Sequence, residues 1–263
     1  MDLYNMIAGL TVGLLVGVTG VGGGSLMAPI LILLLGVAPI TAVGTDLWFA
    51  AITKSVGGFI HHRHRGTDGG PDFQIVRRLC IGSLPAAALT LWLLARTDTQ
   101  AIKSGLILHL LGAALLLTAG ATLLRPHMQR AALRFRARSA AGLDRFQTPM
   151  TVVAGALLGA VVTLTSVGAG ALGAVMLFAL YPLRLTTRKL VATDIVHAVP
   201  LTLVAGLGHL SLGNVDVPLL GGLLLGSIPG IIAGSLFASR ASDRILRPLL
   251  ALVLVVTGVR LLL

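Results

Sequence analysis

The chain has 263 residues, of which 56% are hydrophobic and 11% are charged, and its mean hydropathy is +0.95. This composition is typical of membrane proteins and excludes a soluble globular domain. The net charge of +11 does not indicate nucleic-acid binding, because the basic residues lie in short loops between apolar runs rather than on a polar domain.

Ten apolar runs follow one another along the chain, and many approach the roughly 20 residues that a membrane-spanning helix needs. They predict an all-α, polytopic bundle of transmembrane helices in contact with the lipid bilayer. The runs are 3–21, 24–37, 45–60, 79–95, 101–124, 149–166, 171–181, 190–210, 217–238 and 246–263.

Residues 3–45 carry no charge, and this stretch is too long for one span but short for two spans with their loops. We therefore expect a helical hairpin that is broken at a run of glycines, where the backbone can take angles closed to other residues. The expected tip comprises Gly22, Gly23, Gly24 and Ser25. The helix that follows would point its free N–H groups and positive dipole end into the membrane, which predicts an anion site made of backbone.

Glycines also recur at every fourth position in the first arm of this hairpin and of a similar one later in the chain. This spacing indicates a ridge of small residues on which another helix packs closely, rather than a binding site. The glycines are Gly9, Gly13 and Gly17, and later Gly155 and Gly159.

The run 45–60 places ionisable residues at membrane depth, where they are costly and are candidates for function. Asp46 follows Thr45 near the expected start of a helix, so its carboxylate either caps that helix or handles substrate or protons. Lys54 lies about two turns further on roughly the same face. We interpret it as a buried amine that faces an anion pathway; the alternative is a side chain that reaches the cytoplasmic surface.

The sequence repeats itself. "AGLTVGLLVGVTGVGGGSL" at 8–26 resembles "AGALLGAVVTLTSVGAGAL" at 154–172, an offset of 146 residues. Three further pairs recur in the same order: "VGTD" with "VATD", "GGFIH" with "AGLGH", and "GSLP" with "GSIP". We infer a first membrane repeat over 1–124, a basic cytoplasmic linker over 125–148, and a second membrane repeat over 149–263.

The second half carries its own tip at Gly168 and Gly170, which would enter the membrane from the opposite face and clamp the same anion. Thr193 and Asp194 match Thr45 and Asp46 of the first half. His197 follows Asp194 by one turn, so the two side chains can share a face and a hydrogen bond, and such a pair can carry protons.

Orientation follows from the basic residues. If each half begins with a hairpin that turns back, sixteen Lys and Arg lie on one face and three on the other, with Lys54 inside an apolar run. The basic face is then cytoplasmic, both termini lie outside, and the two halves are inverted. The alternative is a parallel repeat of four plain spans in each half. The segment "HHRHR" at 61–65 is interpreted as an anchor beside anionic lipid rather than as a metal site.

These residues resemble the sulfite exporter TauE/SafE family of membrane carriers. The resemblance rests on "GVGGGSLMAPILILLLGVAPITAVGTDL" at 20–47, on its echo in the second half, and on "HAVPLTLVAGLGHLSLGNVD" at 197–216. It implies a carrier of sulfite, sulfonates or related small anions, with the two glycine tips and Thr45 and Thr193 as the matching site residues. The family often has serine or asparagine where this chain has Asp46 and Asp194.

The sequence therefore predicts a secondary carrier, not an enzyme, that moves a small sulfur oxyanion across the inner membrane by alternating access. The expected direction of transport is export. The anion would contact both tips, Thr45, Thr193 and Lys54, and Asp46, Asp194 and His197 would couple protons. No cofactor or resident metal is expected, and a homodimer is left open. The alternatives are a divalent-metal carrier that uses the aspartates and His197, a passive anion channel, and a membrane-embedded enzyme.

Overall fold

The computed structural model describes residues 3–19, 26–63, 70–97, 100–138, 144–168, 170–237 and 243–263. These residues form ten α-helices and no strand, which confirms the predicted all-helical class. The helices of the first half are α1 (Leu3–Thr19), α2 (Met27–Leu33), α3 (Pro39–Arg63), α4 (Phe73–Arg96) and α5 (Gln100–Arg138). Those of the second half are α6 (Asp144–Thr165), α7 (Ala171–Leu180), α8 (Thr187–Ser211), α9 (Val217–Phe237) and α10 (Asp243–Leu262).

Five helical segments within the described residues are long and apolar enough to cross a membrane. Their outer sides expose large apolar residues; on α4, for example, Leu89, Trp92 and Leu93 are each more than half exposed. Apolar surface of this extent needs a lipid environment, so the chain is a multi-pass membrane protein. The segments are Phe73–Arg96, Ser104–Leu124, Phe146–Thr165, Arg188–Ser211 and Val217–Gly234.

The second arm of each hairpin is too short to span. α2 has 7 residues and α7 has 10, which gives lengths of about 10 and 15 Å against a hydrocarbon core of about 30 Å. The arms of the second hairpin end side by side: Gln147 Nε2 donates to the Leu180 carbonyl at 3.3 Å, and Thr151 Oγ1 lies 2.7 Å from Tyr181 Oη. This hairpin therefore turns back at its glycines, as the sequence predicts.

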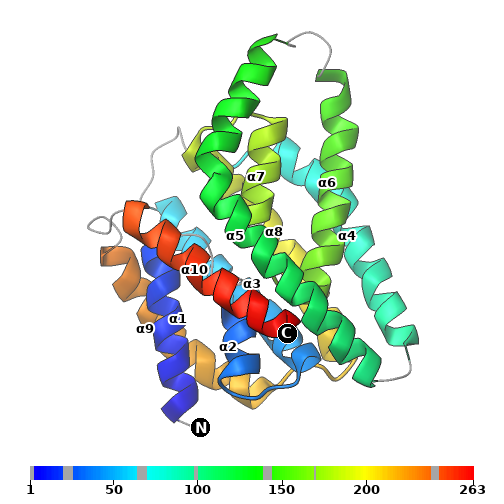
Figure 1. Ribbon diagram of the computed structural model, residues 1–263, viewed down its shortest axis with the longest axis vertical. Coiled ribbons are helices and arrows are strands. Elements are labelled where there is room, and N and C mark those ends of the chain that lie inside the picture. Colours follow the sequence, from blue (N-terminus) through cyan, green and yellow to red (C-terminus); the bar gives the residue numbers. More distant parts are fainter. Residues whose placement is uncertain are drawn as a thin grey trace.

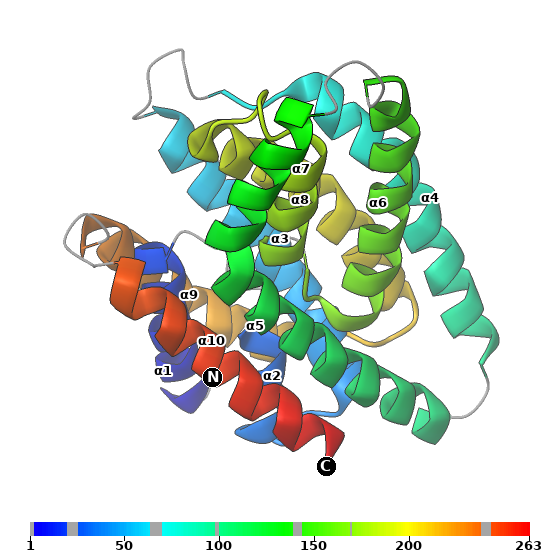
Figure 2. The ribbon, with the colours of Figure 1, turned by 45° about the horizontal axis from the view of Figure 1, so that its top comes forward.

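Helices from different halves form the closest pairs. α1 packs along α9, and α6 packs along α4, as both views of the ribbon show (Figures 1 and 2). The predicted glycine ridges lie in these contacts: Gly9 and Gly13 face the backbone of α9, and Gly155 and Gly159 face the backbone of α4. The packing role predicted for these four glycines is confirmed.

The helices α3 and α8 cross in the middle of the molecule (Figure 1). Val43 and Leu47 of α3 share an apolar cluster with Ala198 and Leu201 of α8, and all four are buried. Near the start of α3, a Cβ on Gly44 would overlap the carbonyl of Asn214, just beyond the end of α8. The two helices therefore run antiparallel, with each one's start beside the other's end.

The long helix α5 has 39 residues and packs against α10 (Figure 2). It continues through residue 138, well past the expected boundary at 124. The first part of the segment 125–148 is therefore helical, and α6 already begins at Asp144. The extension is long and carries arginines, so it need not lie within the apolar core of a bilayer.

Candidate functional site

The helix break of the second half lies in the interior. α6 ends at Thr165 and α7 begins at Ala171. Ser166, Gly168 and Gly170 have positive φ angles of 56°, 123° and 153°. One amide in the first turn of α7 is paired with the tip itself, because Gly173 donates to the Gly168 carbonyl at 3.1 Å. The corresponding tip of the first half, Gly22, Gly23, Gly24 and Ser25, lies outside the described residues.

Described residues of the two hairpins share one buried apolar cluster. Val167 of the second tip belongs to the same buried apolar cluster as Leu26 and Ala28, which begin the short helix of the first hairpin. Val167 and Ala28 are fully buried. The second tip and the start of α2 therefore border the same apolar core, although they come from different halves of the chain.

The two matched aspartates lie at these helix starts. The Ala28 amide in the first turn of α2 donates to Asp46 Oδ2 at 3.3 Å. On the other side, a Cβ on Gly173 in the first turn of α7 would overlap Asp194 Oδ1. Each carboxylate therefore faces the N-terminal end of the hairpin helix of its own half, where the helix dipole favours negative charge. An anion that enters there meets these carboxylates.

Lys54 is the cation of this region. It is 7% exposed, and its charge interacts with both Asp194 and Asp46. The predicted amine is thus buried rather than at a surface.

His197 is fully buried, but its partner differs from the one predicted. Its Nε2 lies 2.9 Å from Ser83 Oγ on α4, and its Nδ1 has no hydrogen-bond partner. The spacing to Asp194 suggested a hydrogen bond within α8, and the ring instead joins α8 to α4.

The matched threonines hold the halves together. Thr45 Oγ1 accepts a hydrogen bond at 3.1 Å from the amide of Asp216, the residue that precedes α9. Thr193 Oγ1 accepts one at 2.9 Å from the amide of Asp72, the residue that precedes α4. Each threonine thus binds the start of a helix in the other half, and the Thr193 hydroxyl proton is used by the Lys189 carbonyl at 2.7 Å.

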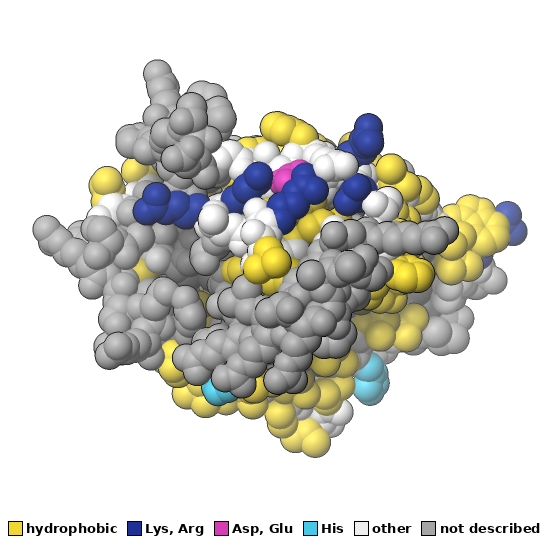
Figure 3. All heavy atoms as spheres, turned by 90° about the horizontal axis from the view of Figure 1, so that it is seen from above, with side chains coloured by type: hydrophobic (Ala, Val, Ile, Leu, Met, Phe, Trp, Pro, Cys, Tyr) yellow, Lys and Arg dark blue, Asp and Glu magenta, His cyan; other side chains and the backbone are white. Residues whose placement is uncertain are grey.

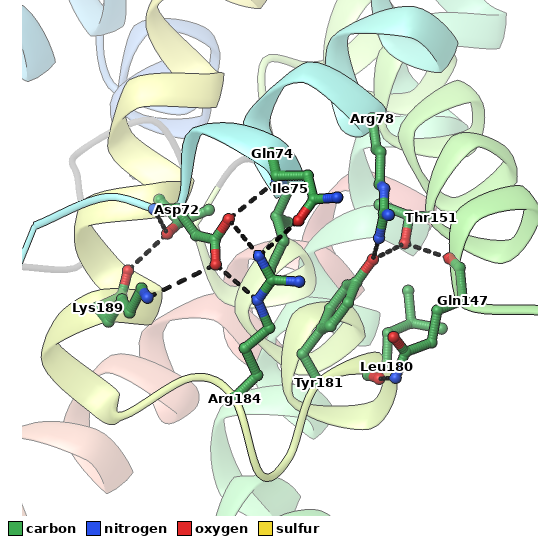
Figure 4. Close-up of polar contacts among 11 residues, drawn as sticks. Asp72, Gln74, Ile75, Arg78, Gln147, Thr151, Leu180, Tyr181, Arg184 and Lys189 are labelled. Carbon is green, nitrogen blue, oxygen red and sulfur yellow. Dashed lines mark hydrogen bonds and ion pairs between the residues drawn. The ribbon is translucent and has the colours of Figure 1, made fainter. Parts of the chain in front are cut away.

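The contact at Thr193 is reinforced by charge (Figure 4). Asp72, whose side chain is 6% exposed, caps α4 by accepting from the Ile75 amide, and it pairs with Arg184 at 2.7 Å and with Lys189 at 3.6 Å. Burial alone would raise the pKa of the Asp72 carboxyl. The hydrogen bonds from Arg184 and Ile75 and the charges of Arg184 and Lys189 outweigh burial and lower it.

This network belongs to a basic face. Figure 3 shows Lys and Arg side chains gathered around an acidic group on the face seen from above. Next to the network, Arg78 Nη1 donates to Tyr181 Oη at 3.0 Å (Figure 4). The equivalent contact at Thr45 has no such support, because residues 34–38 of the neighbouring loop carry no charge. One local sequence signal marks this network: an aspartate directly before an apolar helix is typical of an N-cap residue.

Within the described ranges, no group of three His, Cys, Asp or Glu side chains lies close enough to hold a metal ion. Asp46, Asp194 and His197 therefore do not form such a group in this arrangement.

Comparison with known proteins identifies the family. The family model described as "Sulfite exporter TauE/SafE" matches residues 5–261. The chain belongs to the TauE/SafE family. Members of this family are membrane transporters rather than enzymes, which agrees with the apolar spans and confirms the resemblance noted in the sequence.

Two relatives from Bacillus subtilis (strain 168) extend this comparison. The chain is 37% identical over 262 residues to "Probable membrane transporter protein YjnA", covering 99% of this chain and all of the relative. It is 25% identical over 250 residues to "Probable membrane transporter protein YdhB", covering 95% of this chain and 96% of the relative. No solved structure matches the chain.

Proposed function

We propose that this protein is a secondary transporter of a small sulfur-containing oxyanion, sulfite or an organosulfonate, which it moves by alternating access and couples to an ion gradient. Membership of the TauE/SafE family supports the substrate class. The observation that carries the proposal is the buried break of the second hairpin, whose Val167 belongs to the same apolar cluster as Leu26 and Ala28 at the start of the short helix of the first hairpin. Unwound backbone at such depth is tolerated where it is buried in protein or lines a pathway.

The anion would be held by the glycine tips, with Gly168 and Gly170 on one side and Gly22, Gly23, Gly24 and Ser25 on the other. Lys54 supplies the positive charge, since it is buried and its charge acts on both Asp194 and Asp46. We do not assign the anion to Thr193, because its one hydroxyl proton is used by a carbonyl and its oxygen accepts the Asp72 amide. Asp46, Asp194 and His197 are the groups available for proton coupling.

We further propose that the two halves are inverted repeats. The antiparallel crossing of α3 and α8 supports this arrangement. So do the paired contacts in which Thr45 binds the residue before α9 and Thr193 binds the residue before α4. Inverted repeats place equivalent gates at opposite faces of a membrane, which is the geometry that alternating access uses.

The excess of Lys and Arg on one face supports a cytoplasmic location for that face in the inner membrane. With hairpins that turn back in both halves, the two termini would lie on the outside. Export is the direction we propose, in line with the family's designation as sulfite exporters.

The test is a thermal-shift screen of the purified protein in detergent, because a ligand that binds only the folded state raises the melting temperature. The ligands are sulfite, thiosulfate, sulfate, sulfoacetate, taurine, chloride, nickel and zinc. We expect stabilisation by at least one sulfur oxyanion. Stabilisation by a divalent metal alone would overturn the proposal in favour of a metal carrier.

Variants locate the binding site in the same assay. Gly168→Ala places a side chain at a φ of 123° in the tip, whereas Gly213→Ala does so at a φ of 73° in a loop with open space around it. Both variants carry backbone strain, but only Gly168→Ala should lose the anion-induced shift. Equal shifts in the two variants would remove the tip from the site.

Lys54→Met tests the charge. We expect weaker anion transport into proteoliposomes at equal protein incorporation, since the cation is removed and two carboxylates remain. Transport equal to that of the unaltered protein would remove Lys54 from the mechanism. Flux that neither saturates nor responds to a gradient would indicate a passive channel instead of a carrier.

A further inference from the structure

A cluster of charged and polar side chains joins the two halves at the basic face (Figure 4). Arg184, in the loop before α8, donates from Nε to Asp72 Oδ2 at 2.7 Å and from Nη2 to Asp72 Oδ1 at 3.0 Å. Its Nη2 also donates to Gln74 Oε1 at 2.8 Å, and Lys189 Nζ lies 3.6 Å from Asp72 Oδ2. Two N–H···O bonds between one guanidinium and one carboxylate are among the strong hydrogen bonds of proteins. These four side chains form what we call the latch.

The latch lies close to the proposed anion site along α8. Thr193 Oγ1 accepts the amide of Asp72, which carries the acidic side chain of the latch. The next residue, Asp194, faces the first turn of α7, where a Cβ on Gly173 would overlap its Oδ1. The loop that carries Arg184 joins the end of α7 to the start of α8. The latch therefore ties the start of α4 to both helices that follow the second tip.

The equivalent contact of the other half has the same backbone arrangement. Thr45 Oγ1 accepts the amide of Asp216 at 3.1 Å. Asp216 Oδ1 accepts from the Leu219 amide at 2.9 Å, so this side chain caps α9 in the way that Asp72 caps α4. Because α3 and α8 run antiparallel, the two threonine contacts lie at opposite ends of their crossing.

The charges of the latch have no counterpart at that second contact. "VGTD" begins at 43 and "VATD" at 191, so equivalent residues in this part of the repeat differ by 148 positions. Gly36 therefore stands in the place of Arg184, and Thr41 in the place of Lys189. Among the described residues, no lysine or arginine forms an ion pair with Asp216. The two ends share one backbone contact, but only the basic face adds an ion pair to it.

We propose that the latch is a charged gate that holds the basic face closed, so that the protein without substrate favours the state that is open at the opposite face. The inference rests on the proposed function, because alternating access requires each face to open in turn. Opening of the basic face moves the start of α4 away from the start of α8 and breaks the latch. Opening of the opposite face breaks the Thr45 contact and no ion pair. The charges therefore stabilise only one of the two closed ends.

The expected size of this preference is modest. The side chain of Asp72 is 6% exposed, but that of Arg184 is 41% exposed, so water replaces part of the lost hydrogen bonding when the latch opens. A partly exposed pair of this kind shifts a two-state equilibrium by about fivefold. A bound substrate can reverse such a preference. The net direction of transport follows the gradients of the anion and the coupling ion, so a basic face that is closed at rest is compatible with export.

The test is the labelling of an interior cysteine from each side of the membrane, which needs no substrate. Ser166→Cys in a Cys80→Ser background places the single thiol of the chain at the second tip, at a position that is 3% exposed. A membrane-impermeant maleimide is applied to right-side-out and to inside-out vesicles, and the readout is the ratio of the two labelling rates. In the same background, Arg77→Cys, at an exposed position in α4 beside the latch, identifies the vesicles that present the basic face.

Asp72→Asn removes the charge of the latch and keeps the cap of α4, since asparagine caps helices as well as aspartate does. We expect faster labelling of the tip from the basic face and slower labelling from the opposite face, with a change of about fivefold in the ratio. Arg184→Gln should give the same shift, and it serves if Asp72→Asn does not fold. A contact that only holds the fold together would, once weakened, raise labelling from both faces alike. An unchanged ratio in both variants would overturn the gate.

Asp216→Asn is the matched control, because it makes the same substitution at the equivalent cap, where no cation pairs with the carboxylate. Its ratio should equal that of the unaltered protein, and a change as large as that of Asp72→Asn would show that charge pairing is not the cause. Failure of the proposed function is measured separately, as absence of radiolabelled sulfite exchange by the unaltered protein in proteoliposomes. A tip thiol that is labelled from neither face would contradict alternating access itself.

Discussion

The glycine contacts between the halves give the sharpest prediction for stability. Gly82 on α4 and Gly226 on α9 occupy equivalent positions in the two Gly-Ser-x-Pro motifs. A Cβ on Gly82 would overlap the Val152 carbonyl of α6, and a Cβ on Gly226 would overlap the Met6 carbonyl of α1. We therefore expect Gly82→Ala and Gly226→Ala to destabilise the protein.

The magnitude follows from the atoms involved. The overlap is with backbone, so no side chain can turn away, and the helix pair must separate by roughly 1 Å and lose dispersion contacts along its length. Overpacking of this kind costs about 1–3 kcal/mol, and we expect the upper end, about 3 kcal/mol. A helical alanine regains about 1 kcal/mol in propensity over glycine. That gain is shared by Gly221→Ala on α9, whose new Cβ would meet no atom within 4 Å.

The measurement is thermal unfolding of the variants in one detergent. The difference between Gly82→Ala and Gly221→Ala isolates the packing term, and about 3 kcal/mol corresponds to a melting temperature lower by roughly 6–12 °C for a chain of this size. Gly226→Ala should fall by a similar amount because its contact is equivalent. Gly82→Ala melting at or above Gly221→Ala would refute the close approach of α4 and α6.

Two further predictions concern the contacts that join the halves. Asp72→Asn should cost about 1 kcal/mol, a small value because Arg184 is 41% exposed and can rehydrate. Since the native pKa of Asp72 is lowered, this advantage of the unaltered protein should hold above about pH 4 and vanish as the pH falls through the native pKa; a difference that persists in acid would contradict the ion pairs. Thr193→Val leaves the buried Asp72 amide without its acceptor, so it should cost about 1–3 kcal/mol in denaturation by heat. The equivalent Thr45→Val should cost less, because the Asp216 amide is only partly buried, and the reverse order would refute this reasoning.

The sequence predicted those features that depend on local pattern. Hydropathy and length sufficed for the helical class, since an apolar chain in lipid must satisfy its backbone within helices. The closely spaced Gly168 and Gly170 predicted the break between α6 and α7, and glycines at every fourth position predicted the packing ridges. The expectation that Asp46, Lys54 and Asp194 are buried also agrees with the structure, because each lies inside an apolar run.

The features that were missed depend on residues far apart in the chain. Asp72 and Arg184 are separated by 112 positions, and both lie in loops whose charges the sequence suggests are solvated. The hydrogen bonds of the Thr193 hydroxyl with the Lys189 carbonyl and the Asp72 amide had no local signal either, because Asp72 is 121 positions away. The positive φ of Ser166 was not predicted, because no sequence pattern indicates a left-handed backbone at a serine.

The glycine-lined pairs also define how the molecule can move. Backbone contact along α1 with α9, and along α6 with α4, leaves no layer of side chains that could slide or tilt. Each pair should therefore behave as one rigid strut, and each strut contains one helix from either half of the sequence. Any rearrangement that opens one face of the membrane must then swing these mixed struts against the crossed centre of α3 and α8. The units that move as rigid bodies are therefore these mixed helix pairs, and not the two repeats of the sequence.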